Sequence, residues 1–262
     1  MVSLSDACTP VRSGDRYQFE VLPGWQQGRG AFGGLVIGGL VRAIEHHTAD
    51  PARKLRSLTA ELPGPALTGM TEITVEPLRQ GKNLSAVRAA LVQDGEVKSH
   101  AVAILAASRT AGPAVSWNDL PPPSLPHWTD VAPIQFGGAP QFGQHFEYRV
   151  VEGMLGSGGA PRSLGWIRAR DPGALRDAAY IAAMADAWWP AAMVKLAGRP
   201  MATIAYTLEI LGAVDDLDPA APLVYRAVVP VCTDGYFVET RELWTETGRL
   251  IATNHQTFAI IQ

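Results

Sequence analysis

One carboxylate stands alone in an apolar stretch of this sequence. Asp186 lies in AAYIAAMADAWWPAAMV, residues 178–194, where no other residue is charged. Burying a carboxylate costs several kcal/mol unless hydrogen bonds or charges compensate, and desolvation raises its pKa. Asp186 is therefore the first candidate for a residue that carries chemistry. The alternative is that Asp186 faces a solvent stripe or caps a neighbouring element.

A pair of carboxamides interrupts the apolar face of the last predicted strand. In RLIATNHQTFAII, residues 249–261, strict alternation places Leu, Ala, Phe and Ile on one face together with Asn254 and Gln256. A buried amide must find hydrogen-bond partners, and a partner on a buried helix is the natural candidate. A purely structural hydrogen bond is the alternative for Gln256. Thr203, in MATIAYTLE, begins an earlier strand, where threonine taken alone indicates a structural role.

The stretch GRGAFGG, residues 28–34, contains the spacing G-x-G-x-x-G, and Asp50 follows at the distance typical of a dinucleotide-binding fingerprint. That fingerprint needs a buried strand running directly into the first glycine, whereas LPGWQQ precedes Gly28. Asp50 stands before Pro51 in a turn rather than at the end of a second strand. We therefore interpret these glycines as the entry to a helix, where they allow close backbone approach and the helix start leaves N–H groups free.

The same order of elements occurs on each side of a proline-rich stretch, residues 113–140. Each half contains one apolar helix, predicted at about residues 32–47 and 173–196, followed by four strand-like runs joined by short turns. Aligning Asp94-Gly95 with Thr247-Gly248 superposes VRAALVQDGEVKSHAVAIL on TRELWTETGRLIATNHQTF without a gap. Both helices are apolar nearly all round, which indicates that they are buried.

A curved antiparallel sheet wrapping one central helix is the hotdog arrangement. Two copies predict an α+β double hotdog, with two antiparallel sheets each wrapping a long central helix. The predicted domains are an N-terminal hotdog at residues 1–110, a Pro-rich linker at 111–143 and a C-terminal hotdog at 144–262. A doubly wound fold is excluded, because strand–helix–parallel strand crossovers do not recur.

Composition narrows the classes of partner. The chain has 262 residues, of which 47% are hydrophobic and 18% charged, with a net charge of -3 and no long basic run, so we expect no nucleic acid partner. Cys8 and Cys232 show no pairing or metal spacing, which favours a reducing compartment. No segment is long and unbroken enough for a membrane span. The sequence predicts a soluble cytoplasmic protein without a metal.

The whole chain resembles the type II acyl-CoA thioesterases, double-hotdog enzymes that hydrolyse medium- and long-chain acyl-CoA. In the first half the resemblance rests on GAFGGLVIGGLV and TVEPLRQGKNLSAVRAALVQDGEV. In the second half it rests on AAMADAWWP, ATIAYT and GRLIATNHQTF. The resemblance implies that Asp186, Thr203 and Gln256 form the catalytic set that binds the attacking water.

The activity implied is that of a hydrolase of lipid metabolism, which converts an acyl-CoA thioester to free acid and CoA. Gly33, Gly34 and Trp188 are the candidate substrate-binding residues. Free N–H groups at the helix start could bind the thioester oxygen or a phosphate of CoA. No cofactor is expected, because CoA is part of the substrate. Hotdog units commonly pair through sheet edges, so a homodimer or higher oligomer is expected.

Some residues depart from the family pattern. The family usually follows its threonine with an acidic residue and a histidine, whereas Ala205 and Tyr206 stand here, and Asn254 and His255 precede the glutamine. These departures leave a second interpretation open, a non-catalytic protein that binds acyl-CoA or an acyl carrier. A third, a hotdog dehydratase, would need a histidine with an acidic partner, and no histidine is predicted on a helix facing the sheet.

Overall fold

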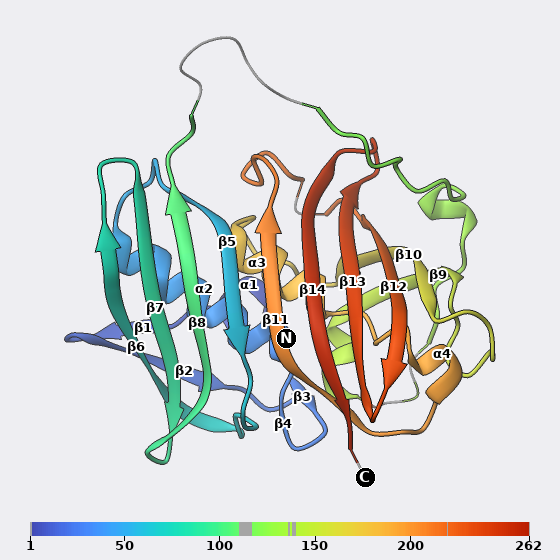
Figure 1. Cartoon of the computed structure of the whole chain (residues 1–262), viewed down its shortest axis with the longest axis horizontal. Coiled ribbons are helices and arrows are strands. Elements are labelled where there is room, and N and C mark those ends of the chain that lie inside the picture. The colour runs from blue at the N-terminus through green and yellow to red at the C-terminus, as the bar shows by residue number, and fades with distance from the viewer. Residues whose placement is uncertain (1, 110–116, 136, 138–139, 219, 262) are drawn as a thin grey trace.

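Strands with alternating burial form one antiparallel sheet. The computed structural model describes residues 2–109, 117–135, 137, 140–218 and 220–261. Within those residues the strands pair in the order β1-β2-β6-β7-β8-β5-β11-β14-β13-β12-β10-β9, each antiparallel to its neighbour (Figure 1). The strands are β1 (Val11–Ser13), β2 (Arg16–Val21), β5 (Lys54–Glu61), β6 (Gly69–Gln80), β7 (Leu84–Gln93), β8 (Glu96–Ala106), β9 (Phe146–Glu152), β10 (Arg162–Ala169), β11 (Met201–Ile210), β12 (Leu223–Thr233), β13 (Tyr236–Thr245) and β14 (Leu250–Ile260).

The remaining elements are helices and one small hairpin. The hairpin pairs β3 (Gln26–Gln27) with β4 (Gly30–Ala31). In the described part of the chain, no helix is both long and apolar enough to cross a membrane. The helices are α1 (Leu4–Ala7), α2 (Gly33–Thr48), η1 (Trp128–Asp130), η2 (Gln141–His145), α3 (Ala178–Asp186) and α4 (Met193–Leu196).

The strand order is symmetric about the centre of the sheet. β5 and β11 pair in the middle, and β8-β7-β6-β2-β1 on one side match β14-β13-β12-β10-β9 on the other. The prediction of two separate sheets is wrong, because backbone pairing such as Leu58 opposite Leu208 joins the halves edge to edge. A free edge exposes unpaired N–H and C=O groups, and this pairing satisfies them along both central strands.

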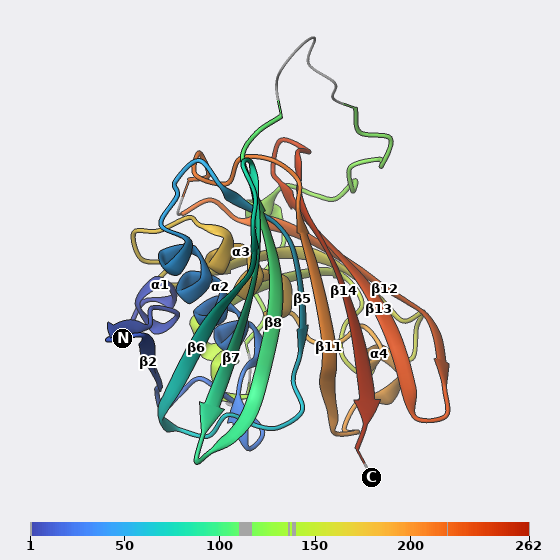
Figure 2. The same ribbon diagram turned by 60° about the vertical axis from the view of Figure 1, so that its left-hand side comes forward.

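Helices α2 and α3 lie side by side on the same face of the curved sheet (Figure 2). They run antiparallel, since Gly34 lies against Ala183 and Gly38 against Ala179. The helix predicted at about residues 32–47 is confirmed as α2, Gly33–Thr48. Each helix therefore presents its first turn to the last turn of the other, at the junction of the two halves.

The helix predicted at about residues 173–196 is wrong in length. It begins at Ala178, where the Asp177 side chain accepts a hydrogen bond from Tyr180 N at 2.9 Å and caps the helix. It ends at Asp186, because Pro190 has no N–H to donate and disfavours helical backbone in the residue before it. This early end makes Asp186 the last helical residue.

The glycines of α2 permit the close approach of α3. A Cβ at Gly34 would lie 2.9 Å from the Ala183 carbonyl oxygen, and one at Gly38 would lie 3.3 Å from that of Ala179. Of the glycines with the fingerprint spacing, Gly33 begins α2 and Gly30 lies against Pro65, whereas the helix packing depends on Gly34 and Gly38. Asp50 likewise lies in the turn after α2, where its carboxylate pairs with Arg53 at 2.8 Å.

Part of the proline-rich stretch packs on the outer face of the second half. Trp128 and Trp166 contact edge to face, and Trp166 Nε1 donates to Pro126 O at 3.0 Å. The Arg149 guanidinium lies 4.1 Å from the Trp128 ring centroid, a cation–π distance. Residues 111–116, 136, 138 and 139 of the predicted linker lie outside the described residues, as does residue 110 of the predicted N-terminal hotdog.

We predict that Gly34→Ala lowers the free energy of unfolding by about 1–3 kcal/mol, the usual cost of overpacking. Alanine is the better helix former by about 1 kcal/mol, but its Cβ would lie 2.4 Å from Phe32 Cζ. Urea unfolding followed by circular dichroism measures the change. Gly64→Ala is the control, because its Cβ would meet only Lys98 Cδ at 3.5 Å. Equal stability of the two variants would contradict this account of α2.

Candidate active site

The Asp186 carboxylate lies where α3, α2 and β14 meet. Its Oδ1 accepts a hydrogen bond from Gln256 Nε2 at 2.9 Å, and its Oδ2 accepts one from Gly34 N at 2.7 Å. Asp186 is 8% exposed and Gln256 1%. The structure thus brings together the two residues singled out in the sequence, one from an apolar helix and one from the buried face of the last strand.

The hydrogen-bond network fixes the orientation of Gln256. Besides Asp186, its Nε2 donates to Asn254 Oδ1 at 2.9 Å, and its Oε1 accepts from Thr203 Oγ1 at 3.0 Å. Asn254 Nδ2 in turn donates to Thr207 O at 2.5 Å. Both Gln256 N–H groups are therefore in use, and only a lone pair on Oε1 stays available to a ligand.

A β-bulge turns Thr203 toward this network. The register of β11 against β14 shifts between Thr203 and Ala205, and Ile204 is the extra residue. Counting back by twos from the buried Tyr206 would place Ile204 on the inner face. With the bulge, Ile204 is 37% exposed and Thr203 faces Gln256 instead.

Two buried charges that the sequence reasoning missed complete the site. Arg241 Nη1 donates to Ala185 O at 3.0 Å and lies 3.4 Å from Asp186 Oδ1. Its Nε donates to Glu239 Oε1 at 2.8 Å, and Glu239 Oε2 accepts from Ala191 N at 2.7 Å. Arg241 therefore pairs with two carboxylates and also satisfies a carbonyl in the last turn of α3.

A signal for these charges was present in the sequence. Residues 236–245 alternate as residues 249–261 do, and Glu239 and Arg241 fall on the same face as Phe237 and Leu243. The same alternation that places Gln256 on a buried strand face places Glu239 and Arg241 on one. Charged residues on an apolar strand face must be paired, and residues two apart on a strand lie on one face.

Opposing effects set the pKa of Asp186. Burial raises it, while Arg241, the Gln256 amide and the Gly34 N–H lower it, and the net pKa lies above the ordinary value of an aspartate. Tyr206 lies on the strand beside Gln256, and its hydroxyl donates to Ala182 O at 3.0 Å. Burial, together with the Asp186 charge, raises the Tyr206 pKa well above its usual value, so this hydroxyl stays neutral.

Of the predicted substrate-binding residues, Gly33 lies beside Asp186, whereas Trp188 packs against Tyr225. A Cβ at Gly33 would lie 2.8 Å from Asp186 Oδ2, so this glycine forms the wall beside the carboxylate. Trp188 is buried, with its ring stacked on Tyr225 at 4.9 Å between centroids. Its Nε1 has no hydrogen-bond partner among the described residues. A role for these residues in substrate binding stays a prediction.

The first half lacks the polar groups of this site. In the alignment of the two halves, Ala101 and Ala103 of β8 correspond to Asn254 and Gln256 of β14, and all four are buried. At the other end of the helix pair, the Asp177 carboxylate accepts from Arg42 Nε at 2.8 Å and from Tyr180 N of its own helix at 2.9 Å. Within the described ranges, no group of three or more His, Cys, Asp and Glu side chains is placed to hold a metal ion.

Comparison with known families matches both halves. The profile described as acyl-CoA thioesterase N-terminal domain matches residues 21–110, and the one described as acyl-CoA thioesterase C-terminal domain matches residues 117–260. A search of curated proteins finds no match.

Solved structures share the fold over the whole chain. A conserved protein of unknown function with a hot dog fold from Alicyclobacillus acidocaldarius is 23% identical, with a TM-score of 0.89 over 100% of this chain and 99% of that one. The acyl-CoA thioesterase II TesB2 of Mycobacterium marinum is 22% identical, with a TM-score of 0.78 over 99% and 98%. The tesB protein of Mycobacterium avium subsp. paratuberculosis is 18% identical, with a TM-score of 0.79 over 99% and 98%. At these identities the similarity establishes the hot dog fold.

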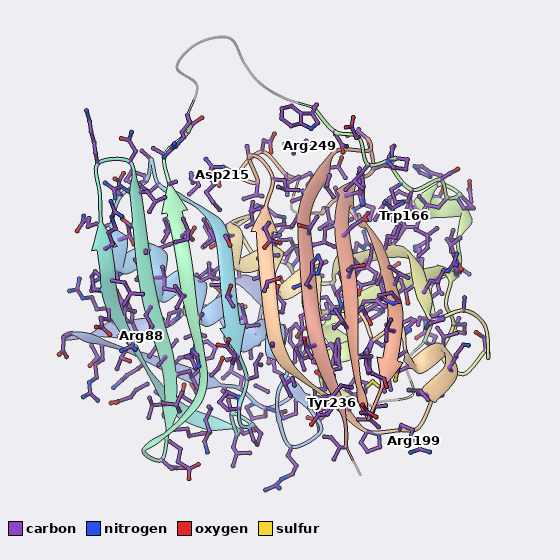
Figure 3. All side chains as sticks on the ribbon, in the orientation of Figure 1. Arg88, Trp166, Arg199, Asp215, Tyr236 and Arg249 are labelled. Atoms are coloured by element: carbon purple, nitrogen blue, oxygen red, sulfur yellow. The ribbon has the colours of Figure 1, made fainter. Side chains whose placement is uncertain are left out.

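We predict that Arg241→Met lowers the free energy of unfolding by about 3–5 kcal/mol, because two buried carboxylates lose their cation. Arg88→Met is the matched control. Arg88 occupies the corresponding place on β7 in the first half (Figure 3), where it pairs with Glu76 in solvent. Its loss should cost about 0–1 kcal/mol. Denaturant unfolding of both variants measures the difference, and similar costs would show that the buried network does not depend on Arg241.

Proposed function

This chain belongs to the acyl-CoA thioesterase family, and from that premise we propose that it hydrolyses acyl-CoA thioesters to free acid and CoA. Asp186, Thr203 and Gln256 bind the attacking water. The observation that carries the proposal is the buried hydrogen bond from Gln256 Nε2 to Asp186 Oδ1. The pKa of this carboxylate is raised, and the neighbouring Gln256 Oε1 and Thr203 Oγ1 each have a lone pair that can accept a further hydrogen bond.

The unused lone pairs define how the water is held. Gln256 Oε1 accepts from Thr203, and both N–H groups of Gln256 already have acceptors. The water therefore donates one hydrogen to the Asp186 carboxylate and the other to Gln256 Oε1 or Thr203 Oγ1. Its oxygen lone pair is then left to face the thioester carbon, which is the orientation that attack needs.

The reaction proceeds by addition and elimination. The water oxygen bonds to the thioester carbon while Asp186 takes one of its protons, and the carbonyl oxygen becomes an oxyanion. The tetrahedral intermediate then collapses, the carbon–sulfur bond breaks and the proton on Asp186 passes to the CoA sulfur. The products are the free acid and CoA thiol, and Asp186 is again ionised.

The Gly33 N–H is our candidate donor to the oxyanion. Gly34 N is bound to Asp186 Oδ2, whereas Gly33 N is the first amide of α2 and has no partner among the residues that the structure describes. A free N–H at a helix start points along the axis and stabilises negative charge in front of it. Gly33 also adjoins Asp186 Oδ2, so the donor and the base flank one position.

Further features of the proposal come from the sequence. We propose that hydrolysis needs no cofactor and no metal, and that the chain divides into residues 1–110, 111–143 and 144–262. A cytoplasmic location, a role in lipid metabolism and a homodimer or higher oligomer stay predictions.

We predict that Asp186→Asn lowers kcat by about 10²–10⁴, the usual contribution of a positioned base. Release of CoA thiol from a panel of acyl-CoAs of different chain length measures the rate, and circular dichroism checks the fold. Asp94→Asn, the same change in the exposed turn between β7 and β8, is the matched control and should leave kcat unchanged. Wild-type activity in Asp186→Asn would exclude its role as base. Acyl-CoA binding without thiol release by the wild-type protein would favour a binding protein instead.

We also predict an acid limb in the pH dependence of kcat/KM. Asp186 accepts a proton only when ionised, so activity falls as the pH falls through its pKa. Burial holds that pKa above the ordinary 3.8, and the limb should therefore lie above pH 3.8. Initial rates of thiol release across pH, with the fold checked at each value, test this. Constant kcat/KM down to pH 4 would contradict it.

A further inference from the structure

A cavity of about 600 Å³ lies at the end of the helix pair opposite Asp186. The last turn of α2 and the first turn of α3 line it, together with β5 and the segment after β11. We call it the Glu45 cavity and define it by Glu45, Leu55, Asp177, Ile210, Val214 and Asp215. Figure 3 labels Asp215 beyond the end of β11. Its volume is within the range of small-molecule sites, about 300–1,000 Å³.

The acidic groups at this cavity differ in whether they are paired. The Asp177 carboxylate is bound by Arg42, and the Asp215 carboxylate lies 2.8 Å from Lys54 Nζ. Asp50, also in the lining, pairs with Arg53. Glu45 is partly buried, and its carboxylate has no hydrogen bond or ion pair among the described residues.

The surroundings of Glu45 disfavour its negative charge. It lies in the last turn of α2, where the helix carbonyls are partially negative. Burial raises its pKa to about 7; Asp177 and Asp215 act in the same direction, while Lys54 and Arg42 oppose them. A cation bound beside Glu45 would supply the positive charge that the Glu45 carboxylate lacks in this structure.

Apolar groups complete the cavity. Leu55 and Ala178 lie toward the core, and Ile210 and Val214 continue the wall along β11 and beyond it. We propose that the Glu45 cavity binds an organic ammonium compound, with its nitrogen at the Glu45 carboxylate and its hydrocarbon body against this wall. The site is independent of thioester hydrolysis, because Asp186 lies at the other end of the same two helices.

Arg56 also lines the cavity, and its positive charge could instead favour an organic anion. Arg56 has no acidic partner within the described ranges, and its Nε donates to Ala106 O at 3.3 Å. If Arg56 rather than Glu45 governed the site, an organic anion would bind instead. The charge of the preferred ligand therefore distinguishes the two residues.

Isothermal titration calorimetry with hexylammonium, hexanoate and hexanol tests the proposal. At pH 8 we expect hexylammonium to bind at least tenfold more tightly than the other two. Glu45→Gln, which keeps the shape and removes the charge, should weaken hexylammonium binding at least tenfold. Glu20→Gln, a change on the exposed face of β2, should leave it unchanged. Circular dichroism checks that both variants fold.

The pH dependence supplies a second readout. Hexylammonium stays charged below about pH 10, as lysine does. Binding should therefore weaken between pH 8 and pH 6 as Glu45 takes up a proton, and this change should vanish in Glu45→Gln. Tighter binding of hexanoate, equal binding of hexylammonium by wild type and Glu45→Gln, or no binding of hexylammonium would each overturn the proposal.

Discussion

The carboxylate of Asp186 is the point on which the two halves of this protein converge. It ends α3 of the second half, and it is bound by the first turn of α2 from the first half and by β14. Burial of a carboxylate costs free energy, because the charge loses its hydration. Here the Gly34 N–H, the Gln256 amide and the Arg241 guanidinium stabilise the charge of Asp186. The contact depends on Gly33, whose Cβ would lie 2.8 Å from Asp186 Oδ2, and on Gly34, whose Cβ would lie 2.9 Å from the Ala183 carbonyl oxygen of α3. The glycines at the start of α2 are therefore required by the same buried contact that stabilises the Asp186 carboxylate.

The architecture is nearly symmetric, but its chemistry is not. Strand order and helix pairing repeat about the β5–β11 junction, while the buried network of Asp186, Arg241 and Gln256 occurs only in the second half. Where β14 carries Asn254 and Gln256, β8 carries alanines, and the arginine of β7 points to solvent where Arg241 is buried. A duplicated fold can keep its packing while only one half keeps the carboxamides on its sheet, because apolar replacement of a satisfied network need not destabilise the core.

Local patterns in the sequence predicted a good part of this arrangement. The 16-residue helix α2, the inward face of β14 and the polar pair on it all follow from periodicity. The exposed His255 follows from the same alternation. What alternation cannot give is the bulge at Ile204, which reverses the face of Thr203, or the edge pairing of β5 with β11 across about 150 residues. The second helix was predicted too long, because its apolar composition continues through Pro190 while its hydrogen bonding does not.

Charge balance connects the buried network to the proposed chemistry. Asp186 and Glu239 face the single cation Arg241, so the cluster carries one excess negative charge when both acids are ionised. Arg241 is bound through Nε to Glu239 at 2.8 Å and lies 3.4 Å from Asp186, so the stronger pairing belongs to Glu239. The excess charge then falls on Asp186, and taking a proton from water makes the cluster neutral. In a buried site, that change favours the carboxylate as a base, since the low dielectric of the interior screens the excess charge poorly.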